Sequence, residues 1–269
     1  MSAGIPVDTI RFQFELRPVA EVPPWGSHVA NLHWFGLTSG WYWIEVGGHQ
    51  LLRYRDEAVA RWELERPYPD YYVVRLWEDM LILRAALHEP VPDDLIAFVD
   101  GTSPRRDYPE DDWSEDVDKA LDLQSDFDVY CGYLTDAPVL RAWRHVTDGQ
   151  DVVSVCQRIL PAEEGTFDGP ERLVVTVPTE EFFAAVDDFD RRLMAAMDER
   201  VTELERTGPP PDIELDVAHL RVEHGQRCGW LAARLAAPRH VDWARVRAGA
   251  AEIATWPPWT GDEESEPDS

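Results

Sequence analysis

Four residues near the C-terminal end of the sequence have the spacing of metal ligands. His224 and Cys228 are four residues apart, and Asp216 and His219 are three apart, so each pair shares one side of a helix. A zinc site needs three or four converging ligands, and one helix face supplies only two here. His224 and Cys228 also fall on an apolar stripe, which is typical of a core histidine above a buried cysteine. We therefore expect no metal site.

Carboxylates gather between residues 107 and 118, where seven of the twelve residues are acidic. A calcium loop of the helix-loop-helix type needs a glycine at its sixth position, and counting from Asp126 the sixth residue is Cys131. The run therefore predicts a solvated acidic loop that attracts cationic groups. The candidate contacts in this loop are Asp111, Asp112 and Glu115.

The compact motifs of common catalytic sites are missing. The sequence has no glycine-rich nucleotide fingerprint, phosphate loop, HExxH, CxxC or GxSxG motif, and we expect no cofactor. A site assembled from distant residues stays open, because a catalytic triad is defined by geometry. Glu78 and Asp79 are adjacent carboxylates on an expected helix, where neighbours diverge by about 100°. We do not expect them to act on one substrate atom.

Aromatic residues crowd the first fifty positions, and Trp34, Trp41 and Trp43 are the candidate binding residues among them. Trp41 and Trp43 share one face of an expected strand, and Tyr42 shares the other face with Ile44. Two interpretations stay open. The rings form a platform for a partner, a peptide or a sugar, or they form core packing beneath two helices.

The net charge is −27, from 25 basic and 52 acidic residues. A body of this charge is repelled by phosphate backbones and anionic membranes, so we expect neither as a partner. Only residues 208–254 lack an acidic excess, and their arginines either receive an anion or neutralise the rest of the fold. No apolar run approaches the ~20 residues of a membrane span. Without a secretory pattern and with three scattered cysteines, the expected location is the cytoplasm.

Periodicity predicts an α+β fold, an antiparallel sheet built from hairpins and packed against a long amphipathic helix, with a helical C-terminal segment. Gly47-Gly48 and Asp148-Gly149 are the expected hairpin turns. We expect one domain over 8–258, with disordered tails at 1–7 and 259–269. Its segments are a β-meander at 10–54 with strands at 10–17, 32–37, 41–46 and 49–54, helices at 70–88 and 93–99, a second β group at 139–177, and helices at 180–206, 213–235 and 241–253 within 180–254.

Several strings of the sequence are familiar as a set. They are IRFQFELRPVAEVPPWG (10–26), LHWFGLTSGWYWIEVGGHQLLRY (32–54), DYYVVRLWEDML (70–81), PVLRAWRHVTDGQDVVSV (138–155) and EFFAAVDDFDRRLMAAMDERV (181–201). Together they resemble a family of uncharacterised bacterial proteins found mainly in actinomycetes, a domain of unknown function. The resemblance covers residues 10–205 and is weak beyond them. It implies one evolutionary unit over that range, and no activity, ligand or catalytic residue.

These observations favour a non-catalytic cytoplasmic binding protein for a basic macromolecular partner, such as a protein, by electrostatic steering and a few aromatic anchors. A toxin-neutralising immunity protein is an analogy for such a role. The alternative is an enzyme of an unrecognised family with a cleft that contains carboxylates. A flat, acidic face with aromatic residues would favour the binder, and titratable groups deep in an apolar pocket would favour the enzyme. The sequence leaves the oligomeric state open.

Overall fold

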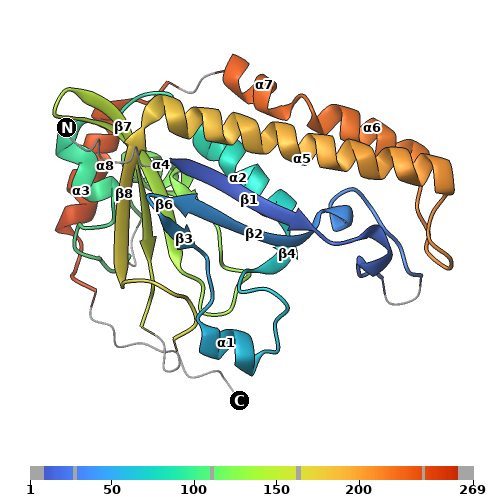
Figure 1. Cartoon of the computed structure of the whole chain (residues 1–269). Helices are drawn as coiled ribbons and strands as arrows, with labels where there is room; N and C mark the ends of the chain where they lie inside the picture. Colours follow the sequence, from blue (N-terminus) through green and yellow to red (C-terminus); the bar gives the residue numbers. More distant parts are fainter. Residues whose placement is uncertain (1–8, 27–28, 110–111, 162–164, 238–239, 260–269) are drawn as a thin grey trace, which may run out of the picture.

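The computed structural model describes residues 9–26, 29–109, 112–161, 165–237 and 240–259, and it has an α+β fold (Figure 1). Its strands form two separate four-stranded antiparallel sheets. Among the described residues, no helix has both the length and the apolar character needed to cross a membrane. The first sheet contains β1 (Ile10–Leu16), β2 (Ser39–Val46), β3 (His49–Leu51) and β4 (Asp70–Tyr72). The second contains β5 (Asp128–Val129), β6 (Val139–Thr147), β7 (Gln150–Arg158) and β8 (Arg172–Pro178).

Both predicted hairpin turns are confirmed. Gly47 and Gly48 join β2 to β3, and Asp148 and Gly149 join β6 to β7. All four turn residues have positive φ, which is the backbone conformation that a two-residue hairpin turn requires. The turns therefore fix the register of each antiparallel pair.

The strand predicted over 32–37 is wrong, because this segment ends in a 3-10 turn over Gly36–Thr38. The Thr38 hydroxyl donates to the Phe35 carbonyl at 2.7 Å and closes the turn. The same hydroxyl accepts from the backbone N–H of Val74 at the start of a helix. One side chain thus ties the entry of β2 to that helix.

Helices surround the two sheets, and the longest described one is α5, as predicted. The apolar stripe of α5 is buried against β1, because the helix runs along that edge of the first sheet (Figure 1). Arg192 and Arg200 donate from α5 to the carbonyls of Phe12 and Arg17, which lie on or just beyond β1. The helices are α1 (Asp56–Arg61), α2 (Val73–Ala86), α3 (Ile96–Val99), α4 (Glu115–Asp126), α5 (Thr179–Thr207), α6 (Val217–Arg227), α7 (Trp230–Ala236) and α8 (Trp243–Thr255).

Two predicted helices differ from the structure, one at its start and the other at its start and in its middle. The helix expected over 70–88 begins only at Val73, because the three residues before it pair with β2 as β4. The helix expected over 213–235 is broken between Arg227 and Trp230 into α6 and α7. Gly229 lies in this break, where its low helix propensity makes an interruption inexpensive.

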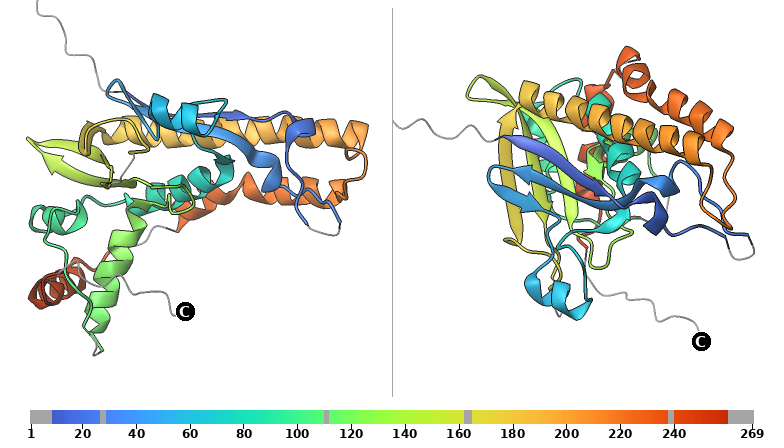
Figure 2. Two further views of the ribbon diagram at one scale, coloured as in Figure 1. Left: turned by 90° about the horizontal axis from the view of Figure 1, so that it is seen from below. Right: turned by 45° about the vertical axis from the view of Figure 1, so that its right-hand side comes forward.

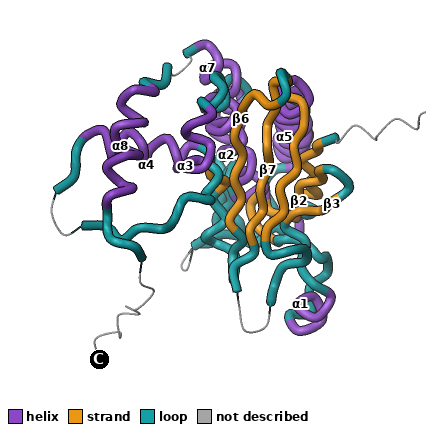
Figure 3. The backbone as a smooth tube through the Cα atoms, turned by 90° about the vertical axis from the view of Figure 1, so that its left-hand side faces the viewer, coloured by secondary structure: helices purple, strands orange, loops and turns teal. Residues whose placement is uncertain are grey.

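The helices α4 and α8 pack closely against each other and lie together with α3 to one side of the sheets (Figures 2 and 3). Gly249 of α8 makes their crossing possible. A Cβ at Gly249 would overlap the carbonyl of Asp116 and crowd the N–H of Val117 in the first turn of α4. We call α4 and α8, with the chain segments 105–109, 112–114 and 256–259 that adjoin them, the α4–α8 lobe.

Candidate functional site

The tryptophans predicted to bind a partner are mostly inside the molecule. Trp34 is fully buried and donates its indole N–H to Nδ1 of His224 at 3.3 Å. Trp41 is 4% exposed, and the guanidinium of Arg17 lies 4.4 Å from its ring centroid. Trp34 and Trp41 are therefore core residues in this structure, and their rings do not form a platform for a partner.

Trp43 is the exception among the three, because its side chain is half-buried. Its ring stacks on Tyr68 with centroids 4.2 Å apart, and its indole N–H donates to Glu45 at 3.1 Å. Both contacts hold the ring against the first sheet. A binding role for Trp43 stays a prediction.

The pair His224 and Cys228 also differs from its predicted arrangement. His224 is buried as expected, but Cys228 is exposed, and its Sγ lies 3.5 Å from Nε2 of His224. Burial lowers the pKa of His224, and the Asp198 carboxylate opposes this shift. Within the described residues no three His, Cys, Asp or Glu side chains converge as metal ligands would.

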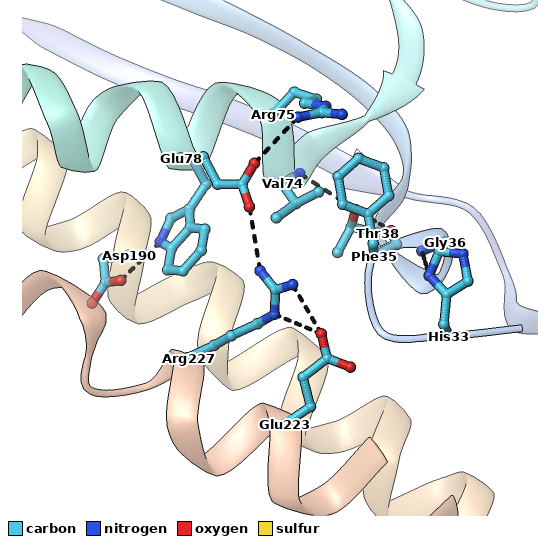
Figure 4. Close-up of polar contacts among 11 residues, drawn as sticks. His33, Phe35, Gly36, Thr38, Val74, Arg75, Glu78, Asp190, Glu223 and Arg227 are labelled. Carbon is cyan, nitrogen blue, oxygen red and sulfur yellow. Dashed lines mark hydrogen bonds and ion pairs between the residues drawn. The ribbon is translucent and has the colours of Figure 1, made fainter. Parts of the chain in front are cut away.

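A buried arginine fastens α6 and α7 to the rest of the fold (Figure 4). The guanidinium of Arg227 lies between two indole rings, 4.3 Å from the centroid of Trp34 and 4.6 Å from that of Trp230. It pairs with Glu223 at 2.9 Å and with Glu78 at 3.4 Å. The charge of Arg227 is thus balanced by carboxylates and covered by aromatic rings.

Other arginines of residues 208–254 also pair with carboxylates, at more exposed positions. Arg221 binds two carboxylates of α5, and Arg247 binds Asp94. Arg245 reaches Glu115 and Asp116 in the first turn of α4. These pairs support the interpretation in which this segment neutralises acidic neighbours.

The acidic loop proves to be aromatic as well. Tyr108, Trp113 and Trp256 form a cluster whose ring centroids lie 5.5–5.8 Å apart. Tyr108 is 63% exposed and Trp113 is 38% exposed, whereas Trp256 is buried beneath them. Trp259 lies nearby with half of its surface exposed. We call this surface the acidic aromatic face, and its residues are Asp107, Tyr108, Asp112, Trp113, Glu115, Asp118, Trp256 and Trp259.

Backbone pairing brings the two halves of this face together. The N–H of Asp107 donates to the carbonyl of Pro257, and the N–H of Trp259 donates to the carbonyl of Arg105. Arg106 adds a hydrogen bond from its guanidinium to the carbonyl of Trp256 at 3.1 Å. Trp259, predicted to begin a disordered tail, is therefore part of the folded structure. Residues 1–8 and 260–269 lie outside the described residues.

Side chains of α4 and α8 set the position of the carboxylates. Ser114 caps α4 by accepting from the N–H of Val117, and it donates its own hydroxyl to Glu252 of α8 at 2.5 Å. The indole N–H of Trp113 donates to Asp118 at 2.7 Å. These bonds orient Trp113 and the first turn of α4 relative to α8.

The predicted acidic contacts fall on this face where the structure describes them. Asp112 is exposed, and Glu115 is 87% exposed although it pairs with Arg245 at 3.0 Å. Asp111 lies outside the described residues. The predicted tryptophans are on or beneath the first sheet, so the structure does not bring them together with the acidic residues. The anchors that sequence reasoning missed are Tyr108, Trp113, Trp256 and Trp259, and their signal was aromatic residues inside or next to acidic runs.

A separate cleft of about 530 Å³ contains carboxylates, as the enzyme alternative requires. It lies between α2, the end of α4 and β5, and its lining includes Asp79, Asp126, Asp128 and Cys131. Burial raises the pKa of Asp79 to about 7, although the N–H of Tyr130 donates to its carboxylate at 3.0 Å. Asp79 can therefore exchange a proton near neutral pH.

Ser154 and His145 form a serine–histidine contact on the second sheet. Nε2 of His145 lies 2.9 Å from Oγ of Ser154, which is also 2.9 Å from the hydroxyl of Thr176. Ser154 is only 3% exposed, so its hydroxyl cannot meet a substrate in this conformation. The contact serves the packing of β6, β7 and β8.

Comparison with curated proteins and with solved structures found no match. A family model described as a family of unknown function (DUF5984) matches residues 11–249. The match extends past the resemblance over 10–205, through α6 and α7 and into α8. It therefore includes all of α4 and the first part of α8. Because the model covers most of the chain, the chain belongs to this family of unknown function, DUF5984.

Proposed function

We propose that the protein is a non-catalytic binding protein whose acidic aromatic face receives a basic segment of a partner protein. The observation that carries the proposal is the juxtaposition of exposed rings and carboxylates on the α4–α8 lobe. Tyr108, Trp113 and Trp259 all expose aromatic surface there, beside Asp112 and Glu115. Aromatic anchors and complementary charge are the features that make a surface patch bind a protein.

One arginine of the chain itself already makes the kind of contact that we propose for the partner. The guanidinium of Arg105 lies 4.0 Å from the ring centroid of Trp259. A cation over an indole face is worth about 0.5–1 kcal/mol at an exposed site and more when water is excluded. A partner that covers the face would exclude this water, so arginine side chains are the favoured contacts.

The exposure of the side chains on this face indicates which of them affect association and which affect dissociation. The net charge of −27 steers a basic partner toward the molecule, and this steering weakens as salt rises. Asp112 and Glu115 are exposed, so they chiefly speed association. The rings of Tyr108 and Trp259 lose more water on binding, so they chiefly slow dissociation. A cytoplasmic location, with neither nucleic acid nor membrane as a partner, belongs to the same proposal.

The test is a calorimetric titration with an arginine-rich peptide as the probe. We expect Tyr108→Ala and Trp259→Ala each to weaken binding by about tenfold, the loss typical of an aromatic anchor. Tyr130→Ala is the matched control, because Tyr130 is 65% exposed but lies outside the lobe. Equal weakening by Tyr130→Ala, or equal affinity for a glutamate-rich peptide, would contradict the proposal.

The cleft at Asp79 favours a second candidate function, acid–base catalysis on a small molecule. The supporting observation is the pKa of Asp79, which burial raises to about 7, in a cleft of about 530 Å³. The test is a panel of ester, amide and glycoside substrates. An activity lost in Asp79→Asn and kept in Asp122→Asn, an exposed carboxylate of α4, would favour the enzyme over the binder.

A further inference from the structure

Another cleft lies where β3 approaches the loop before β8. Its volume is about 610 Å³, within the range of small-molecule sites. Figure 3 places β3 on the side of the sheets away from α4 and α8, so this cleft is separate from the acidic aromatic face. The lining residues that matter for binding are Arg11, His49, Arg53, Gln157, Asp168 and Gly169.

Arg11 brings a positive charge to this cleft, where Glu45 is also part of the lining. The pKa of Glu45 is lowered chiefly by its hydrogen bond from Gln13 and in smaller part by the charge of Arg11. Arg11 lies directly across from Glu45 in the pairing of β1 with β2, yet the two side chains form no ion pair. The Glu45 carboxylate instead accepts from the Gln13 amide at 3.0 Å and from the Trp43 indole N–H at 3.1 Å. Among the described residues, no carboxylate lies within ion-pair distance of Arg11. Its exposed guanidinium is therefore available to a ligand.

Gln157 supplies a neutral donor at the base of the cleft. It is 1% exposed, and its amide oxygen accepts from the N–H of Leu52 at 2.9 Å. Its amide nitrogen has no acceptor among the described residues. A Cβ built on Gly169 would lie 3.7 Å from that nitrogen, so the absence of a side chain at Gly169 leaves room in front of it.

Arg53 adds a second guanidinium at the rim. It is held by Asp168 at 3.3 Å and by Asp56 at 3.1 Å, both of which are more than half exposed. These contacts, with a hydrogen bond to the Tyr54 carbonyl at 3.4 Å, position a side chain that is 29% exposed. Five N–H donors leave the guanidinium capacity for a further acceptor. His49 of β3 is exposed in the same lining.

We propose that this cleft binds a small phosphorylated molecule through Arg11, Arg53 and the Gln157 amide. A single guanidinium fork satisfies a carboxylate, whereas two guanidinium groups and an amide match the oxygens and double charge of a phosphate monoester. The overall charge of −27 does not prevent this, because carboxylates farther than ~8 Å are largely screened at physiological salt. Two carboxylates line the cleft itself: Asp168 pairs with Arg53, and Glu45 accepts from Gln13 and Trp43.

The test is an NMR titration of the whole chain with inorganic phosphate as the probe. A parallel titration with acetate shows whether a carboxylate binds as well. We expect saturable shifts of the Gln157 side-chain amide and of the Arg11 Nε–H. Arg11→Gln should weaken phosphate binding by about tenfold or more, because a charged hydrogen bond is lost.

Arg206→Gln is the matched control, since Arg206 is an exposed arginine at the end of α5, outside the cleft lining. Circular dichroism and thermal melting of each variant establish that it is folded. Binding that is unchanged in Arg11→Gln, or weakened equally by Arg206→Gln, would overturn the proposal. So would acetate binding as tightly as phosphate, or a titration without saturation. None of these variants alters the acidic aromatic face, so the outcome is independent of the proposed function.

Discussion

At the scale of single residues, Arg227 shows how an acidic chain uses its few cations. Its guanidinium is enclosed by Trp34 and Trp230 and paired with Glu223 and Glu78, so it joins α6 and α7 to the core. A buried ion pair is not strongly stabilising by itself, because both charges lose water. Removing one partner is costly, however, because the other charge stays in a poorly hydrated place.

We therefore expect Arg227→Ala to lower the free energy of unfolding by about 3 kcal/mol. Arg234→Ala, at an exposed arginine of α7, is the control and should change it by less than about 0.5 kcal/mol. Urea denaturation followed by tryptophan fluorescence measures both. Equal stabilities for the two variants would mean that the enclosed guanidinium does not hold α6 and α7.

Asp79 gives a prediction about pH. Burial raises its pKa from an ordinary 3.8 to about 7. The folded state therefore binds the Asp79 proton more tightly than the unfolded state does, and the stability that depends on this proton is lost as pH rises through about 7. Asp79→Asn keeps an oxygen acceptor for the N–H of Tyr130 and cannot ionise. The variant should gain stability over the natural protein above neutral pH, by at most roughly 4 kcal/mol.

The measurement is urea denaturation of both proteins at pH values below and above 7. The advantage of Asp79→Asn should shrink as the solution becomes acidic. Asp122→Asn is the control, because Asp122 is exposed on α4. A constant difference between Asp79→Asn and the natural protein at all pH values would show that Asp79 does not titrate in this range.

At the scale of elements, the contact between α4 and α8 depends on the absence of one side chain. Gly249 lets α8 approach the Asp116 carbonyl, and this approach places Glu252 at Ser114 and Arg245 at Asp116. The crossing also brings Trp256 beneath Tyr108 and Trp113. The acidic aromatic face is thus a product of close helix packing.

Gly249→Ala should separate the two helices and lower the free energy of unfolding by about 1–3 kcal/mol, the usual cost of overpacking. Gly225→Ala is a close control, because Gly225 also lies in a helix and a Cβ there meets nothing within 4 Å. That variant should be neutral or up to about 1 kcal/mol more stable, since alanine favours helix. Thermal melting of the two proteins distinguishes them. A Gly249→Ala protein as stable as Gly225→Ala would mean that the helices adjust without cost.

The sequence pattern predicted correctly those elements that are determined by neighbouring residues along the chain. Alternation of apolar and polar residues predicted β1, and the turn residues predicted both hairpins. The apolar stripe predicted α5. The errors occurred where a tertiary contact decides. Residues 36–38 form a turn through a hydroxyl that also binds the start of α2, and β4 forms because β2 offers it a pairing edge. No periodicity within those segments records such contacts.

At the scale of the whole molecule, the candidate site joins residues that are about 150 positions apart in the sequence. Tyr108 and Trp113 meet Trp256 only because segment 105–108 hydrogen-bonds to segment 256–259. The acidic half of the face was predictable from composition, and its aromatic half was not. The conspicuous tryptophans at 34 and 41 are buried instead, because a mixed fold of this size needs large side chains in its core.

The distribution of charge over the whole molecule leads to a kinetic prediction. Long-range steering depends on net charge, whereas the final approach depends on charges within about 8 Å of the contact at physiological salt. Two double variants remove the same charge from exposed positions. One is Asp112→Asn with Glu115→Gln, and the other is Glu57→Gln with Glu199→Gln. Only the first pair lies on the acidic aromatic face. Stopped-flow association with the arginine-rich peptide should therefore be slowed more by the first pair.

The difference between the two pairs should depend on salt in a defined way. At low ionic strength both should slow association, because distant charges still act on the peptide. As salt rises, the effect of Glu57→Gln with Glu199→Gln should vanish first, and that of Asp112→Asn with Glu115→Gln should persist longer. Dissociation should change little in either, since exposed charges act mainly on the encounter. Identical salt dependence for the two pairs would mean that the peptide contacts no particular acidic surface, and that the charge of −27 serves solubility alone.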